Sequence, residues 1–275
     1  MNIAFWSNVK HQSGVTSGVA LMSVLWAELF VEEVTVTSNH ICNYGLVKRL
    51  HGGIEYEERT AQKSYNYILG EPEYFRMLYG EKGRKPLFLK ESLSYVPMEG
   101  DGVELFAANG LKGVNKRKKQ EEYLFIDTAC GYGLCSQKIL EEAEVAVVLF
   151  PDSKESIDAF FQSASPYLKN SFFILGNVPK EASCRPSYLT KQYEIPEERI
   201  GTIPYNSGFE QAMKDGTTIA YITGHMYCSK RNSAYHWIYS AKKTVNRLRK
   251  YVIGKRRDIC KDYEEVSEKE FDGDV

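Results

Sequence analysis

Hydrophobic positions fall in short blocks along this chain, and longer segments with helical spacing separate them. The apolar blocks occupy residues 2–7, 33–37, 123–126, 144–150, 171–177 and 199–205. The intervening segments predict helices over 14–30, 135–142, 156–167 and 186–193, with another beginning at 209. Near-continuous apolar strands that alternate with helices are typical of a parallel sheet covered on both faces. The pattern predicts an α/β fold with a doubly wound, mostly parallel sheet.

Two regions depart from this alternation. Residues 51–120 are rich in glycine, tyrosine and charged side chains, and we expect them to form an irregular insert. Residues 258–275 are strongly acidic, and we expect a disordered tail there that screens the basic segment before it. The prediction is therefore a single domain over 1–257 with one insert.

Composition narrows the class of protein. The 275 residues carry 35 Lys and Arg against 36 Asp and Glu, so no global basic field favours nucleic acid. No apolar run approaches the ~18 residues of a membrane helix, and the amino terminus does not resemble a secretory signal. Six cysteines lack zinc-site spacing, so we expect reduced thiols and a cytoplasmic protein.

The segment after the first strand, residues 10–17, has the position of a phosphate-binding loop. Free N–H groups at a helix amino terminus attract phosphate, and such a loop delivers the chain into that helix. Its sequence resembles the deviant phosphate loop K-G-G-x-G-K-T-T of the MinD/ParA family of P-loop ATPases. Lys10 matches the signature lysine, Gly14 the third glycine, Thr16 the magnesium-binding hydroxyl and Ser17 the hydroxyl after it.

The loop also departs from that pattern. His11 and Gln12 replace paired glycines, and Val15 replaces the lysine that reaches the β- and γ-phosphates. An apolar side chain cannot offset phosphate charge. The resemblance nevertheless assigns the whole loop to nucleotide binding: Lys10, His11, Gln12, Ser13, Gly14, Val15, Thr16 and Ser17.

Three further segments carry the resemblance. Residues 126–131 are similar to the family's I-D-T-P-P-G, which implies that Asp127 holds Mg²⁺ together with Thr16 and that Gly131 opens a switch region. Asn177 falls where the family places a base-contacting asparagine. The segment 203–206 resembles the family's I-P-Y-D, which places further residues beside the base: Pro204, Tyr205 and Asn206. The implied ligand is ATP or ADP with Mg²⁺.

The chain lacks one acidic element of ParA-type enzymes. Residues 37–40 read Thr-Ser-Asn-His, where those enzymes carry an aspartate that positions the attacking water. Losing this acid and the Val15-position lysine removes two charge-stabilising groups, so we expect weak or absent hydrolysis. Such divergence looks like the TadZ/CpaE branch. The resemblance implies a dimerising switch or scaffold that positions a pilus or secretion assembly through protein partners.

Two alternatives remain open. The first is an active ATPase that partitions or positions cargo, with Lys10 as a catalytic residue reaching into the partner subunit. The second is a nucleotide-free interaction scaffold. Cys130 and Cys135 flank the switch region, and we interpret them as buried thiols rather than cluster ligands.

The last predicted helix has two faces with different chemistry. Residues 229–257 contain ten Lys and Arg and no Asp or Glu. An apolar stripe at spacings of three and four runs through the same segment: Ile238, Ala241, Val245, Leu248 and Val252. Such a helix binds an anionic membrane or nucleic acid, or packs its stripe on the core. We favour core packing, with the basic face free for a peripheral membrane contact ahead of nucleic acid.

Overall fold

The computed structural model describes residues 1–9, 13–38, 46, 49–50, 87–90, 93–95, 123–163, 169–179 and 181–271. Side chains are described as far as Asp258, apart from those at 87–95 and 134–135. Lys10, His11 and Gln12 of the predicted phosphate loop lie outside the described residues.

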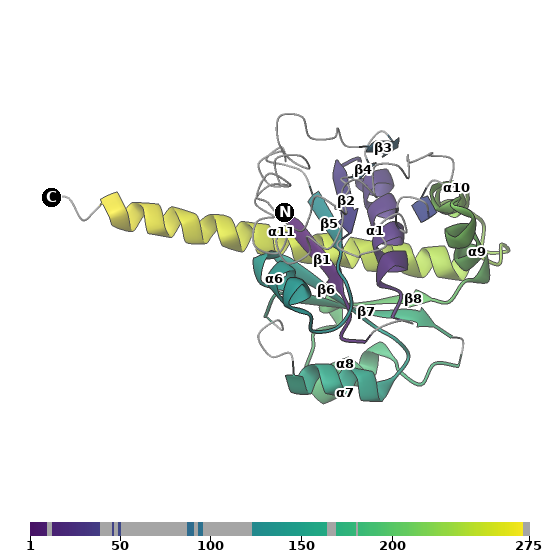
Figure 1. The fold of residues 1–275 in the computed structure, drawn as a ribbon, viewed down its shortest axis with the longest axis horizontal. Helices are drawn as coiled ribbons and strands as arrows, with labels where there is room; N and C mark the ends of the chain where they lie inside the picture. The colour runs from purple at the N-terminus through teal and green to yellow at the C-terminus, as the bar shows by residue number, and fades with distance from the viewer. Residues whose placement is uncertain are drawn as a thin grey trace, which may run out of the picture.

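A single sheet runs through the molecule in the order β3-β4-β2-β5-β1-β6-β7-β8. Its strands are β1 (Asn2–Trp6), β2 (Val34–Ser38), β3 (Leu87–Lys90), β4 (Leu93–Tyr95), β5 (Tyr123–Asp127), β6 (Val145–Phe150), β7 (Ser171–Val178) and β8 (Ile200–Pro204). Only the β3–β4 pair at one edge is antiparallel among these strands. The predicted mostly parallel sheet is therefore confirmed (Figure 1).

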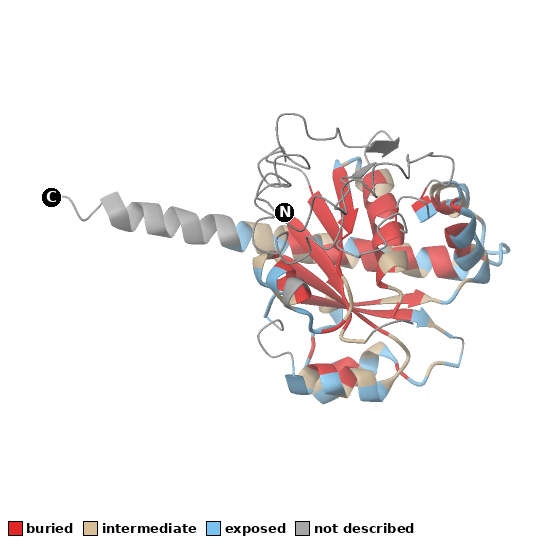
Figure 2. Cartoon of the chain, in the orientation of Figure 1, coloured by how far each residue is buried: buried red, intermediate tan, exposed pale blue. Residues whose placement is uncertain are grey.

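Helices cover both faces of this sheet (Figure 1). They are α1 (Val15–Phe30), α6 (Leu134–Glu142), α7 (Lys154–Ser163), α8 (Pro186–Tyr193), α9 (Ser207–Asp215), α10 (Thr218–His225) and α11 (Tyr235–Phe271). One hydrophobic cluster joins the sheet to α1, α10 and α11, and a second joins the other face to α6, α7 and α8. The strands between them are buried along most of their length (Figure 2).

The predicted irregular insert contributes to the sheet. Strands β3 and β4 lie within residues 51–120, and β4 extends the parallel sheet beside β2. The expectation of irregular structure is thus wrong for 87–90 and 93–95. These strands have only four and three residues, so each leaves a short hydrophobic pattern in the sequence. The rest of the insert lies outside the described residues.

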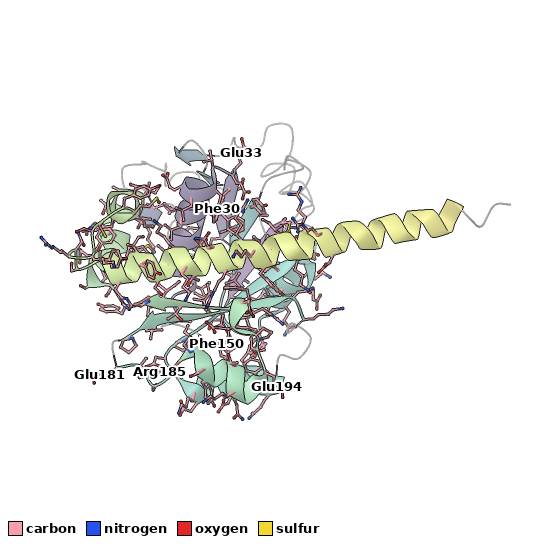
Figure 3. The ribbon with its side chains drawn as sticks, turned by 180° about the vertical axis from the view of Figure 1, so that it is seen from behind. Phe30, Glu33, Phe150, Glu181, Arg185 and Glu194 are labelled. Carbon is pink, nitrogen blue, oxygen red and sulfur yellow. The ribbon has the colours of Figure 1, made fainter. Side chains whose placement is uncertain are left out.

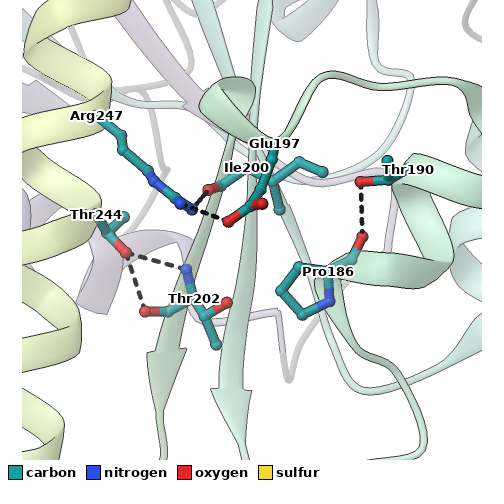
Figure 4. Close-up of polar contacts among 7 residues, drawn as sticks. All are labelled: Pro186, Thr190, Glu197, Ile200, Thr202, Thr244 and Arg247. Atoms are coloured by element: carbon teal, nitrogen blue, oxygen red, sulfur yellow. Dashed lines mark hydrogen bonds and ion pairs between the residues drawn. The ribbon is translucent and has the colours of Figure 1, made fainter.

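Helix α11 crosses the back of the sheet and packs on β8 (Figure 3). Its apolar stripe is buried throughout, so the predicted core packing is confirmed. Thr244 Oγ1 accepts a hydrogen bond from Thr202 N and donates one to Thr202 O, both at 3.0 Å. Arg247 donates to Ile200 O at 2.9 Å and pairs with Glu197 at 2.6 Å (Figure 4). Polar side chains therefore fix the position of α11 along β8.

The structure extends α11 to Phe271, well into the acidic region that we expected to be disordered. Four glutamates and two lysines lie between residues 258 and 271, and both residue types are good helix formers. The helix therefore continues from the domain instead of ending near Arg257, and it projects away from the sheet (Figure 1).

Candidate functional site

The carboxyl ends of the central strands bring the predicted phosphate loop and Asp127 to one edge of the sheet. In the parallel register Phe5 pairs with Asp127, and Asp127 in turn pairs with Ser38. The loop leaves β1 directly after these positions, so it begins beside the Asp127 backbone. Asp127 is buried, with 1% of its surface exposed. Ligands of open α/β sheets bind at this edge.

The loop enters α1 through a left-handed glycine. Gly14 has φ +74°, a conformation that costs a residue with a side chain about 1–2 kcal/mol. Gly14 O accepts from Gly18 N at 2.7 Å, and no side-chain oxygen caps the described end of α1. The first-turn amides of α1 therefore face the loop as an anion site would require.

The end of β7 closes the other side of the loop. A methyl group on Gly176 would lie 2.9 Å from Ser13 O, and one on Gly14 would lie 3.0 Å from Asn177 Nδ2. Asn177 itself has φ +52°, which asparagine tolerates better than most residues. The structure thus brings Asn177 against the phosphate loop.

Thr16 and Ser17 lie in the first turn of α1, and both are partly exposed. Val15, the first residue of α1, is 4% exposed and belongs to the hydrophobic cluster under this helix. The side chain that replaces the family's lysine is therefore part of the core. This placement is consistent with its apolar chemistry and leaves the phosphate region without that positive charge.

A magnesium ion fits the donor set at this edge only in part. Within the described ranges, no group of three His, Cys, Asp or Glu side chains is arranged to hold a metal. Mg²⁺ commonly takes one or two protein oxygens, with the rest supplied by phosphates and water. Asp127 and Thr16 offer oxygens of that kind at the carboxyl ends of β5 and the loop.

The segment after β5 is bound closely to the end of β1. Gly131 N donates to Ser7 O at 2.8 Å, and the Trp6 indole Nε1 donates to Gly131 O at 2.9 Å. Gly131 has a positive φ of 87°, a conformation that glycine adopts without strain. The Trp6 ring also meets the Tyr132 ring edge-on, with centroids 5.2 Å apart.

Helices α6 and α7 hold the same segment from outside. Ser136 Oγ donates to Ala129 O at 2.6 Å, and the Tyr132 hydroxyl lies 2.7 Å from Ser163 Oγ. Cys130 Sγ lies 3.8 Å from Ser13 Oγ, and burial raises the pKa of this thiol above its ordinary value. A raised pKa disfavours the reactive thiolate, which supports the interpretation of Cys130 as an unreactive thiol. Cys130 is only partly buried, and the side chain of Cys135 lies outside the described residues.

Two residues near the loop were not singled out from the sequence. One is Trp6, whose only signal is a large aromatic at the last position of the first strand. The other is Asn8, whose Nδ2 donates to Ser156 O at 2.9 Å while its buried Oδ1 has no partner within the described structure. Asn8 thereby connects the loop to the first turn of α7.

The predicted base-side residues divide into two kinds. Asn206 caps α9: its Oδ1 accepts from Phe209 N at 2.7 Å and from the Tyr221 hydroxyl at 2.9 Å. Tyr205 is 53% exposed and donates to Glu210 at 2.7 Å. Pro204 ends β8 beside Val178. The Asn206 carbonyl oxygen is already committed to the fold, whereas Tyr205 presents its ring at the surface.

Comparison with known proteins gives a fold but no sequence match. No protein-family model matches the chain, and no curated protein sequence matches it. Solved structures do. The septum site-determining protein MinD from Pyrococcus horikoshii, complexed with Mg-ADP, superposes with a TM-score of 0.67 at 13% identity, over 93% of this chain and 99% of that one.

Other solved structures agree. A ParA family ATPase from Chlorobium tepidum gives a TM-score of 0.62 at 12% identity, over 90% of this chain and 98% of that one. A MinC:MinD cell division protein complex from Aquifex aeolicus gives a TM-score of 0.56 at 17% identity, over 90% of this chain and 94% of that one. The chain has the fold of the MinD and ParA ATPases. Among its described residues, no helix combines the length and apolar character of a membrane span.

Proposed function

We propose that this protein is a nucleotide-responsive switch with a MinD/ParA-type fold. It binds ATP or ADP with Mg²⁺ at the edge formed by α1 and β5, and it dimerises to recruit partner proteins. The observation that carries this proposal is the junction at Gly14, where a left-handed glycine opens an uncapped helix beside the buried Asp127. The Mg-ADP bound to the similar MinD structure supports the same choice of ligand.

The residues of this site favour nucleotide binding over nucleotide hydrolysis. The amides of residues 14–17 receive phosphate oxygens, and Thr16 with Asp127 holds Mg²⁺, which neutralises phosphate charge. Val15 is in the core and adds no positive charge. Ser38, beside Asp127, ends β2 without a carboxylate. Hydrolysis is accordingly slow or absent.

The switch in this proposal is the segment 128–133. Its Gly131 N–H exchanges Ser7 O for a phosphate oxygen when a triphosphate occupies the loop. The Trp6 bond to Gly131 O then breaks or lengthens, and the segment alters the face available to a second subunit. Because two hydrogen bonds tie the segment to β1, a move toward a phosphate has to break or replace both of them.

The partner class follows the resemblance to positioning proteins. One similar solved structure is a MinC:MinD complex, which supports protein recruitment as the output. We infer a TadZ/CpaE-like role in positioning a pilus or secretion assembly in the cytoplasm. Exposed basic residues recur every seven positions on the outer face of α11, and they suit a peripheral membrane contact: Lys243, Lys250 and Arg257.

A nucleotide-free scaffold is the second candidate, because Gly131 already has both backbone groups satisfied by β1. Calorimetric titration with ATP and with ADP in magnesium buffer separates the two. We expect saturable heat for the unaltered chain, at least a tenfold weaker affinity for Asp127→Asn, and no change for the exposed control Glu155→Gln. If neither nucleotide produced heat on titration, the nucleotide-free scaffold would be the supported candidate. Hydrolysis abolished by Lys10→Ala would instead support the active ATPase.

A further inference from the structure

Helix α11 has a side that faces away from the domain. Seen from behind, the helix runs across the molecule in front of the sheet (Figure 3). Its inner side is buried, and its opposite side is exposed at every third or fourth residue. We call these exposed positions the outer face of α11: His236, Tyr239, Lys243, Asn246, Lys250, Gly254 and Arg257.

Three positions of the outer face are cationic and recur every seven residues: Lys243, Lys250 and Arg257. Seven residues rise ~10.5 Å along an α-helix and fall only ~20° short of two full turns. The three side chains therefore form a nearly straight row about 21 Å long. Residues 216–257 carry no Asp or Glu, and Asp258 is the first carboxylate beyond the row.

The arginines beside the outer face have carboxylate partners, whereas the row itself does not. Arg247 pairs with Glu197, and Arg249 pairs with Glu32, each at 2.6 Å. Within the part of the chain that the structure describes, the three cations of the row form no ion pair, although Glu197 attracts the first of them through space. The row is thus left with uncompensated positive charge.

The remaining residues of the outer face do not suit a protein partner. A stable protein interface has a desolvated centre of aromatic or aliphatic side chains. Asn246 and Gly254 separate the cations, and Tyr239 at one end is the only large apolar side chain on this face. The aliphatic stripe of α11 is buried in the domain. The outer face therefore offers a partner mainly positive charge.

The straightness of the row favours a flat anionic surface. A leaflet of acidic phospholipids presents its charge in a plane and attracts nearby Lys and Arg side chains, so it meets all three cations at once. The phosphates of a DNA duplex wind around their axis once in about 34 Å, so they turn away from a straight row. Tyr239 is 58% exposed, and tyrosine is enriched where a membrane meets water.

We propose that the outer face of α11 is a docking surface for a bilayer that contains anionic phospholipids. The helix lies parallel to the membrane plane, with its row of cations on headgroup phosphates and Tyr239 at headgroup depth. Because the aliphatic stripe is used in the core, no aliphatic face enters the hydrocarbon, and the contact is electrostatic. It rests on the membrane contact of the proposed function and adds the orientation, the depth and the lipid charge.

Vesicle co-sedimentation without nucleotide and with EDTA tests this contact. Vesicles of equal parts phosphatidylglycerol and phosphatidylcholine should bind the full chain, and phosphatidylcholine alone should not. One Lys or Arg beside an anionic leaflet contributes about fivefold in affinity, so Lys243→Gln, Lys250→Gln and Arg257→Gln together should weaken binding about a hundredfold. Absence of binding by the unaltered chain to the anionic vesicles would overturn the proposal.

Three exposed lysines on the helices of the opposite sheet face provide the matched control: Lys138 of α6, Lys154 of α7 and Lys191 of α8. Replacing all three with Gln removes the same charge and should leave vesicle binding nearly unchanged. Circular dichroism checks that each variant is folded. Equal losses in the two triple variants would show that net charge, and not the outer face, governs binding, which would overturn the proposal.

Salt and DNA test the nature of the contact. Salt of about 1 M, which screens charges within ~3 Å, should release the unaltered chain from the anionic vesicles. Binding that resists this salt would indicate an inserted apolar segment and contradict an electrostatic contact. A mixed-sequence DNA duplex, at phosphate equal to that of the lipid, should leave the chain on the vesicles. Displacement by the duplex would assign the outer face to nucleic acid instead.

Nucleotide titration separates the docking surface from the switch. The outer-face variant should bind ATP as the unaltered chain does, because none of its three substituted residues belongs to the predicted nucleotide site. Vesicle binding without any nucleotide binding would refute the switch and leave the docking surface. Nucleotide binding without vesicle binding would refute the docking surface and leave the switch.

Discussion

Two junctions between a helix and the sheet are built differently. Between α11 and β8, Thr244 and Arg247 satisfy backbone groups of the strand, and Gly201 lets the helix approach closely. At the phosphate loop, Gly14 is left-handed, α1 lacks a side-chain cap and the buried Asn8 Oδ1 has no described partner. The first junction is fixed by polar side chains, whereas the described residues at the second leave the start of α1 without a side-chain cap.

The largest expected effect on stability comes from adding a methyl group to a glycine at the junction of α11 and β8. Gly201→Ala should lower the free energy of unfolding by about 2–3 kcal/mol, because the added methyl would overlap Thr244. Chemical denaturation measures the change. Gly254→Ala, in the same helix layer but with open space around it, should instead raise stability by about 0.5–1 kcal/mol. Equal effects at the two sites would contradict the close approach.

Gly14→Ala applies the same change at the loop. The left-handed φ and the nearby Asn177 amide should cost about 1–2 kcal/mol of stability, and nucleotide affinity should fall with it. Gly224→Ala is the control, because that glycine lies in α10 and has no neighbour within 4 Å. Thermal unfolding with and without Mg-ATP measures both effects. A harmless Gly14→Ala would show that the left-handed junction is dispensable.

Trp6→Phe tests the contact between β1 and the switch segment. Losing the indole hydrogen bond to Gly131 O should lower stability by about 1 kcal/mol and speed amide hydrogen exchange at residues 128–133. Amide exchange should become faster at residues 128–133 and stay unchanged in α11. Faster exchange spread evenly over the sheet would instead indicate general loosening of the core.

A carboxylate on α7 gives the smallest effect. Hydrogen bonds from the Tyr188 and Tyr193 hydroxyls hold the pKa of Asp158 below its ordinary 3.8. The ionised form is therefore favoured by folding, so its stabilisation is present above pH 3.8 and is lost as the pH falls through the lowered pKa. Asp158→Asn should flatten this acid-side loss, measured by denaturation between pH 7 and pH 3. An unchanged pH profile would assign the loss to other carboxyls.

Prediction from the sequence succeeded where structure is encoded locally or by resemblance. Apolar runs predicted the central strands, and β1 and β5, after which the resemblance places the phosphate loop and Asp127, are neighbours in the sheet. The roles of Gly14 and Asp127 in binding stay predictions. Contacts made by residues distant in the chain left no such signal. Trp6 and Gly131 are 125 residues apart, and Thr202 and Thr244 are 42 apart.

Asn206 shows a different limit. Resemblance assigned it to the nucleotide base, while its side chain accepts from the amide three residues later. That pattern is a common helix cap and was available from the sequence. Both assignments use the same residue type, so only the fold shows that the carbonyl oxygen is occupied. A base contact through the remaining amide stays a prediction.

The position of Trp6 has an optical consequence. The chain contains three tryptophans, and Trp26 and Trp237 belong to the hydrophobic cluster on the opposite face of the sheet. In a chain with those two replaced by phenylalanine, the emission of Trp6 would report on one place only. Its indole is bonded to Gly131 and touches Tyr132, so its fluorescence spectrum should shift whenever residues 128–133 move. The protein thereby carries its own label for the motion on which a nucleotide switch depends.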